Sequence, residues 1–120
     1  MQQYELEAWL GDDHGLTDDQ ITELLRTADE IEEQYPDEDD RDDREAALTA
    51  AYRLMTEAPE DLIAGLAAER TAARAAERKA LVALRQIGVT RIGSGDDTEA
   101  GYAQQAGVDR MAVRRWLGKR

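Results

Sequence analysis

The stretch that decides the fold is TEAGYAQQAGVDRMAVRRWL, which spans residues 98–117 and predicts two short helices joined by a tight turn. In the first helix, Tyr102, Ala103 and Ala106 share one face at helical spacing. Gly107 follows where a chain that leaves a helix often needs a positive φ, which glycine adopts at little cost. Asp109 is a favourable N-cap residue for the second helix.

The second helix has an apolar side and a basic side. Val113 and Trp116, three residues apart, form its apolar stripe together with Leu117. The opposite side carries Arg110, Met111, Arg114 and Arg115, and it is followed by Lys119 and Arg120. The helix is therefore expected to bury one side and to leave its cations at the surface.

This pattern resembles the helix-turn-helix motif of DNA-binding proteins. That motif needs a small residue in the middle of its first helix, where Ala103 stands, and a glycine at the turn, where Gly107 stands. Val108, Val113 and Trp116 match its hydrophobic positions after the turn and inside the second helix. The resemblance covers about the last quarter of the chain. It is closest in type to small sigma-factor-like or invertase-like regulators, in which a long helix leads into the motif.

The resemblance implies that the second helix is a recognition helix for the major groove of DNA. The residues that it would place at the groove, its rim or the phosphates are Asp109, Arg110, Met111, Arg114, Arg115, Lys119 and Arg120. Arginine can donate two hydrogen bonds to guanine O6 and N7, so Arg110 and Arg114 are expected at base edges. The expected phosphate contacts are Arg115, Lys119 and Arg120. The alternative is an ordinary helical hairpin whose arginines are only solvated.

The two halves of the chain carry opposite charge. The formal net charge of −12 at first argues against a nucleic-acid partner. Residues 1–60, however, hold 20 acidic side chains and four arginines, whereas residues 61–120 hold seven acidic and eleven basic side chains. Such asymmetry indicates a nucleic-acid-binding region beside an acidic arm.

Residues 1–58 are predicted to be an acidic helical region, and they match no family. A short helix at residues 4–10 precedes a polar turn. Thr17 then opens a second helix through a capping box with Gln20, and Pro36 ends that helix. The apolar face of this helix is expected to consist of Ile21, Leu24, Leu25, Ala28, Ile31 and Tyr35.

The acidic run of residues 37–43 is interpreted as a solvated linker that becomes the N-terminus of a third helix, at about residues 40–58. A sharper interpretation is a phosphate-like surface that competes with DNA for the basic C-terminus. The buried face of the third helix is expected to contain Ala47, Leu48, Ala51, Leu54, Met55 and Ala58.

A long connecting helix is predicted over residues 59–88, because Pro59 suits its first position and Gly88 its end. Its apolar positions are Leu62, Ile63, Leu66, Ala73, Ala80, Leu81, Leu84 and Ile87. The heptad places include Arg70 and Glu77, and this mixture is too polar to predict a coiled coil. The alanine-rich faces would allow close approach of the chain's own earlier helices or of a second copy.

The C-terminal domain is predicted over residues 89–120. Val89-Thr90-Arg91-Ile92 is interpreted as a short extended segment, and residues 93–97 as a flexible loop before an N-cap at Asp97 or Thr98. A two-helix motif of about 20 residues buries too little surface to fold alone. Residues 81–87 should therefore supply the first helix of a three-helix unit. The expected fold is all-α, as the alanine-rich, phenylalanine-free composition also favours.

The sequence predicts neither an enzyme nor a metal or cofactor site. It holds no cysteine and one histidine, His14, beside Asp12 and Asp13 in a predicted loop. Adjacent residues rarely converge on one ion, so a metal site there is a poor interpretation. No P-loop or nucleophile-elbow signature is present. No apolar run reaches the length of a membrane span and no signal peptide is recognisable, so we expect a cytoplasmic protein that is not bound to a membrane.

These features together predict a transcriptional regulator that binds duplex DNA sequence-specifically. One motif makes few contacts, so useful affinity would need a partner or a homodimer formed through the helices of residues 17–87. The alternative function is an acidic interaction module, in which the first half binds a basic protein or mimics DNA. We also hypothesise that the acidic half shields the recognition helix.

Overall fold

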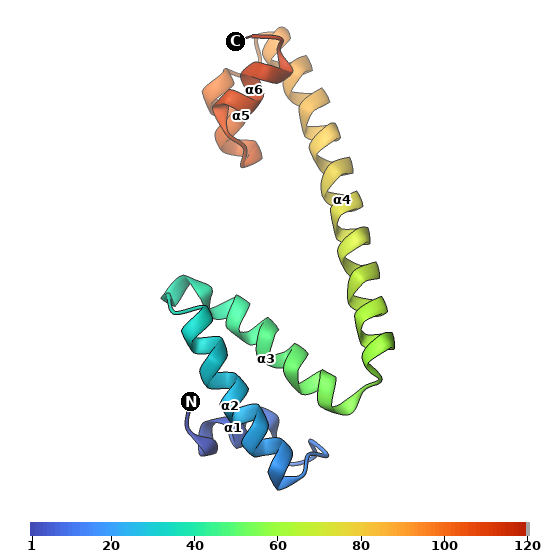
Figure 1. The fold of residues 1–120 in the computed structure, drawn as a ribbon. Helices are drawn as coiled ribbons and strands as arrows, with labels where there is room; N and C mark the ends of the chain where they lie inside the picture. The colour runs from blue at the N-terminus through green and yellow to red at the C-terminus, as the bar shows by residue number, and fades with distance from the viewer. Residues whose placement is uncertain (120) are drawn as a thin grey trace. The chain divides into compact units, whose positions relative to one another are not determined.

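The computed structural model describes residues 1–119, which form six α-helices, one short 3₁₀ turn and no strand (Figure 1). The prediction of an all-α fold is confirmed. The chain divides into two compact units, Met1–Leu66 and the part from Ala67 onward. We call them unit 1 and unit 2, and each is described by itself.

Unit 1 contains α1 (Gln3–Leu10), α2 (Asp18–Gln34), the 3₁₀ turn η1 (Glu38–Asp40), α3 (Arg41–Thr56) and the beginning of α4 (Pro59–Gly93). The predicted capping box opens α2. The hydroxyl of Thr17 accepts from the N–H of Gln20 at 3.2 Å, and the Gln20 side chain accepts from the N–H of Thr17 at 2.9 Å. The core of unit 1 comprises Leu6, Ile21, Leu24, Ala28, Ile31 and Leu48.

Aromatic contacts fasten α1 and the following loop to α3. The ring of Trp9 meets that of Tyr52 edge to face, with 6.3 Å between the centroids. The Tyr52 hydroxyl donates to the His14 carbonyl at 2.7 Å. The His14 Nδ1 accepts from the N–H of Leu16 at 2.9 Å, so this ring nitrogen is occupied in holding the loop.

The acidic run of residues 37–43 is more ordered than the predicted linker. It forms η1 and then the first turn of α3, where Asp42 and Asp43 lie at the positive end of the helix dipole. Arg44 Nη1 donates to the carbonyls of Tyr35 at 2.7 Å and Asp37 at 2.6 Å. Because Arg44 joins the end of α2 to the start of α3 in this way, little of the run remains as linker.

The prediction for the buried face of α3 is wrong at two positions. Leu48 is buried, but Leu54 and Ala58 are exposed, and Ala58 lies beyond the last residue of α3. Tyr52 takes the inward place instead, since it packs against Trp9. Leu54, two residues further, is turned about 200° around the helix and faces solvent.

The predicted end of the long helix is also wrong. α4 passes through Gly88 and runs to Gly93, so the segment Val89–Ile92 is helical and not extended. The Thr90 hydroxyl donates to the Gln86 carbonyl at 2.9 Å, one turn earlier. The β-branched residues of this segment lower helix propensity only slightly, and the continuing hydrogen-bond ladder outweighs that preference.

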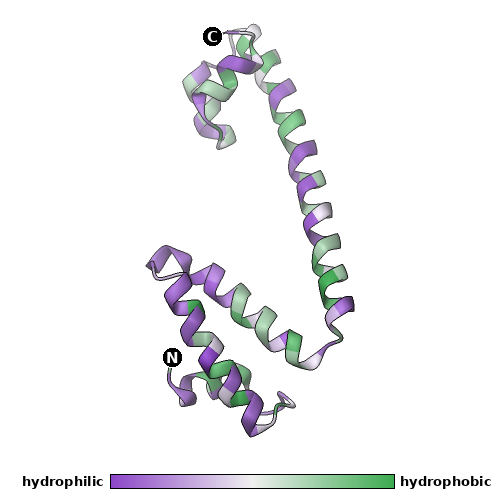
Figure 2. Ribbon diagram, viewed as in Figure 1, coloured by the Kyte–Doolittle hydropathy of each residue, from purple (hydrophilic) through white to green (hydrophobic). Residues whose placement is uncertain are grey.

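Most predicted apolar positions of α4 are exposed. Leu62 is buried and Leu84 is half-buried, whereas Ile63, Leu66, Leu81 and Ile87 are exposed. Figure 2 shows strongly hydrophobic positions toward both ends of α4 and a middle in which alanines alternate with charged residues. No helix within residues 1–119 is both long enough and apolar enough to cross a membrane.

Candidate nucleic-acid interface

The candidate interface lies in unit 2, on α5 (Glu99–Ala106), α6 (Arg110–Trp116) and the turn between them. Thr98 is the N-cap of α5, and its hydroxyl accepts from the N–H of Gly101 at 3.0 Å. A Cβ added at Gly101 would stand 2.9 Å from that hydroxyl. The glycine therefore leaves room for the capping oxygen, a role that was not predicted from the sequence.

The turn has the geometry predicted for it. Gly107 adopts the left-handed conformation, with φ 71° and ψ 31°. Its N–H donates to the Gln104 carbonyl at 3.3 Å, and the N–H of Val108 donates to the Ala103 carbonyl at 3.0 Å. These two bonds form a Schellman motif, which ends α5 and sends the chain into α6 after three residues.

α6 is fixed at its start and along its inner face. The Asp109 carboxylate accepts from the N–H of Met111 at 2.8 Å, as expected of an N-cap. Val113 is only 1% exposed, and Tyr102 and Ala103 of α5 are buried as well. α6 therefore has one buried face, as the sequence predicted, and its orientation follows from that burial.

Tyr102 attaches α5 to the last turns of α4. Its ring lies against Gly88, and its hydroxyl donates to the Leu84 carbonyl. The C-terminal part of α4 thus contacts α5 through this tyrosine. Gly88 has the role of admitting the ring and not of ending the helix, and a single sequence contains no local signal for that contact.

Glu99 links α5 to the basic side of α6. Its Oε2 lies 3.1 Å from Arg114 Nη1, and its Oε1 accepts from Lys119 Nζ. The side chain of Glu99 is 11% exposed. The hydrogen bond from Lys119 lowers the pKa of Glu99 below its ordinary value against the opposing effect of burial, and the charge of Arg114 adds to that lowering. The role of Glu99 was not predicted from the sequence, where its only signal is an acidic residue in the first turn of a predicted helix.

The seven predicted contact residues divide into two groups. Arg110, Met111 and Arg115 are exposed on α6, and the two arginines form no ion pair within residues 1–119. Asp109, Arg114 and Lys119 are already engaged within the unit, Asp109 as the cap and the other two with Glu99. Arg120 lies outside the described residues.

The exposed side of α6 offers chemistry suited to a polar, anionic surface. Guanidinium groups donate to base edges and to phosphates, and the thioether of Met111, which is 51% exposed, offers apolar contact. The surrounding unit has the right charge, because the part of the chain from Ala67 onward contains eleven basic and six acidic residues.

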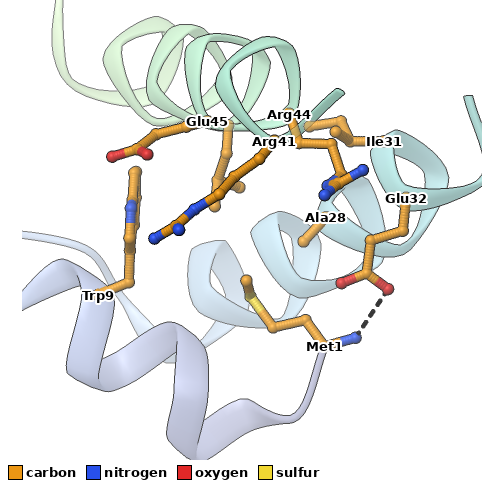
Figure 3. A pocket seen from close by; sticks show the side chains of 9 residues that line it. Met1, Trp9, Ala28, Ile31, Glu32, Arg41, Arg44 and Glu45 are labelled. Carbon is orange, nitrogen blue, oxygen red and sulfur yellow. Dashed lines mark hydrogen bonds and ion pairs between the residues drawn. The ribbon is translucent and has the colours of Figure 1, made fainter. Parts of the chain in front are cut away.

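Unit 1 has a separate pocket of about 300 Å³ between α1, α2 and α3 (Figure 3). The side chains of Trp9, Arg41 and Glu45 point toward it, and the Met1 amino group pairs with Glu32 at 3.3 Å beside it. The charges are of both signs and Arg44 is engaged by backbone carbonyls. The lining of this pocket therefore favours neither an anionic nor a cationic ligand.

No family model, curated protein or solved structure matches this chain. Within residues 1–119, no group of histidine and acidic side chains is arranged to hold a metal ion.

Proposed function

We propose that this chain is a cytoplasmic transcriptional regulator that binds duplex DNA sequence-specifically through a helix-turn-helix formed by α5 and α6. The observation that carries the proposal is the exposed side of α6. It presents Arg110, Met111 and Arg115 outward from a helix whose inner residue, Val113, is buried. A recognition helix needs this combination of a fixed axis and unengaged donors.

Each exposed side chain has a role in the proposal. Arg110, at the first turn of α6, reads a base edge, since the N-terminal residues of a recognition helix reach furthest into the groove. Met111 contacts a thymine methyl group. Arg115, one helical turn further along, binds a phosphate and fixes the register of the helix on the duplex.

Arg114 and Lys119 take part through exchange of partners. In the free protein both pair with Glu99, which leaves their charges partly neutralised. A phosphate or a guanine edge then competes with Glu99 for these donors. Glu99 thus orients the two cations before DNA arrives and is left with fewer partners in the complex.

The test is selection of binding sites from random duplex DNA with the full chain, followed by affinity measurements on the selected site. Arg110→Ala should weaken specific binding by about 1–3 kcal/mol and relax the preference at one base pair. Arg115→Ala should weaken binding to all sequences and reduce the salt slope by about 1. Arg114→Ala should also weaken binding by about 1–3 kcal/mol, with little loss of helicity.

The matched control is Arg26→Ala. Arg26 is an exposed arginine of α2 in unit 1, paired with Glu23 and Glu30. Its removal should leave DNA affinity unchanged. If the α6 variants bind the selected site as tightly as the wild-type chain, or if selection enriches no sequence, the proposal is wrong.

One motif buries too little surface for tight binding, so we propose that the chain acts as a homodimer. A palindromic selected site would support this part of the proposal. A site with a single, asymmetric element and a one-to-one complex would oppose it.

A second function is favoured by the charge of unit 1, which holds 21 acidic residues and four arginines. In this alternative the acidic unit binds a basic protein or occupies a DNA-binding protein by mimicking DNA. The variant Glu38→Gln/Asp39→Asn removes two charges from the exposed turn η1. The alternative predicts that this variant loses the protein partner while Arg110→Ala retains it.

A further inference from the structure

The middle of α4 is a helical stretch whose side chains are exposed. Every residue from 63 to 83 is exposed, including Ile63 at 64% and Leu66 at 40%. Toward the other end of the helix, Ile87 is 51% exposed. Most helical stability in proteins comes from packing of an apolar face, so a helix of this length is expected to be covered.

The residues of α4 at heptad spacing define one face, which we call the seam. The seam consists of Ile63, Leu66, Arg70, Ala73, Glu77, Ala80, Leu84 and Ile87. The large aliphatic residues lie at its two ends, and alanines and the two charged residues lie between them. The order is symmetric about Ala75. Each large aliphatic residue of the seam has another large aliphatic residue at the same distance on the other side of Ala75, and each charged residue has an alanine there.

We propose that a second copy of this chain packs antiparallel against α4 along the seam, with the two-fold axis between the helices at the level of Ala75. In this register Ile63 faces Ile87 of the second copy, and Leu66 faces its Leu84. Arg70 faces Ala80 of the second copy, and Glu77 faces its Ala73. Each long charged side chain thus meets a small one, which leaves room for its aliphatic stem.

The charges on the seam select this orientation. In the antiparallel register Arg70 lies one layer from Glu77 of the second copy, so two symmetric pairs of opposite charge form. In a parallel, in-register pair, Arg70 would meet Arg70 and Glu77 would meet Glu77. Charged residues at seam positions typically cost stability and specify register and direction, and here they favour only the antiparallel pair.

The surface of unit 2 has a hollow where the proposed partner helix would lie. A groove of about 470 Å³ between the end of α4 and α5 is lined by Leu84, Ile87, Tyr102, Gln105 and Ala106 together with two charged residues. In the proposed register Ile63 and Leu66 of the second copy reach the mouth of this groove. The exposed aliphatic residues at one end of α4 thus fit the open apolar surface at the other.

One contact beside the seam is unfavourable for the dimer. Arg74 lies beside the seam, and the two copies of Arg74 approach one another near the axis. Because both are exposed, solvent and salt weaken their repulsion. Arg74→Ala should therefore tighten the dimer, whereas loss of a residue outside the interface should not.

The test measures the mass of the full chain by sedimentation equilibrium without DNA. The wild-type chain should be a dimer in the micromolar range. Arg70→Glu and Glu77→Arg should each weaken dimerisation by about tenfold or more, and the double variant should restore it. Arg78→Glu, an exposed position of α4 outside the seam, is the matched control and should leave the mass unchanged.

The direction of the helices is tested by cysteine pairing, since the chain contains no cysteine. Mixed Leu66→Cys and Leu84→Cys chains should form disulfides between the two variants. A monomeric wild-type chain, a double charge variant that stays monomeric, or disulfides between two Leu66→Cys chains would overturn the proposal. These measurements contain no DNA, so this inference and the proposed DNA binding can fail separately.

Discussion

Gly88 lies so close to the ring of Tyr102 that a Cβ added to the glycine would stand 2.6 Å from Tyr102 Cε1. The ring cannot simply turn aside, because its hydroxyl is hydrogen-bonded to the Leu84 carbonyl. α4 and α5 therefore meet at a contact that admits no side chain on the α4 side. The position of the proposed DNA-binding helices relative to the end of α4 depends on this contact.

Gly88→Ala should destabilise unit 2. Overpacking a close contact costs about 1–3 kcal/mol, whereas alanine in a helix gains at most about 1 kcal/mol over glycine. Gly65→Ala is the matched control, since Gly65 lies in the same helix with nothing within 4 Å of an added Cβ. Thermal unfolding followed by circular dichroism should show a lower midpoint for Gly88→Ala and an equal or higher one for Gly65→Ala. Equal midpoints for the two variants would contradict the contact.

The capping of α6 by Asp109 should depend on its side-chain oxygen and not on its negative charge. Asp109→Ala removes the cap of α6 and should cost about 0.5–2 kcal/mol of unfolding free energy. Asp109→Asn retains an acceptor for the N–H of Met111 and should preserve stability. If DNA is the ligand, Asp109→Asn should also bind it slightly more tightly, because one negative charge beside the phosphates is lost. An alanine variant as stable as the wild-type chain would contradict the capping role.

Glu99 should make the stability of unit 2 depend on pH in the acid range. Its pKa is lowered in the folded state from the ordinary value of 4.5, so the ionised form stabilises the fold above that value. The contribution is lost as the pH falls through the lowered folded-state pKa. Glu99→Gln should therefore melt below the wild-type chain at neutral pH, and the two should converge in acid. Glu57, whose pKa is also lowered, is present in both proteins and cancels in the comparison.

Glu99→Gln should also raise DNA affinity if the proposed exchange of partners is correct. The variant no longer holds Arg114 and Lys119 by charge, so phosphates meet less competition. The measurement is the affinity for a selected duplex at several salt concentrations. A loss of affinity would mean that Glu99 favours DNA binding more by orienting the two cations than it opposes binding by neutralising their charge.

The two leucines of α3 should respond differently to truncation. Leu48 belongs to the core of unit 1, whereas Leu54 is 54% exposed. Leu48→Ala should cost about 2–5 kcal/mol, and Leu54→Ala should stay within about 0.5 kcal/mol of the wild-type chain. Chemical denaturation of both variants gives the comparison. Similar losses would mean that both leucines are buried in solution.

The sequence predicted the features that depend on neighbouring residues. Thr17 with Gln20, Thr98, Gly107 and Asp109 each act within a few residues of their own position, and the structure has all of these caps as expected. Such local hydrogen-bond patterns can be predicted from the residue types at neighbouring positions. Whether α6 reads DNA remains a prediction.

The features that the sequence did not predict depend on contacts between distant residues. Gly88 has the local pattern of a helix end, and only Tyr102, fourteen residues later, explains it. Leu54 fits the spacing of the predicted apolar face of α3, but Tyr52 faces inward instead because its ring packs against Trp9. The role of Glu99 has the same character, since its partners follow fifteen and twenty residues later. At each of these positions, tertiary contacts determine the burial or the role of the residue and override what the local sequence pattern indicates.

The location of Trp9 in unit 1, where its ring packs against Tyr52, has a practical consequence. The chain contains two tryptophans, and the other, Trp116, lies at the end of α6. Each unit therefore carries its own intrinsic fluorophore. Tryptophan emission from a Trp9→Phe chain reports only on the C-terminal helices, and that from a Trp116→Phe chain only on the acidic unit. Emission from these two proteins makes the melting, ligand response and self-association of each unit visible without an added label.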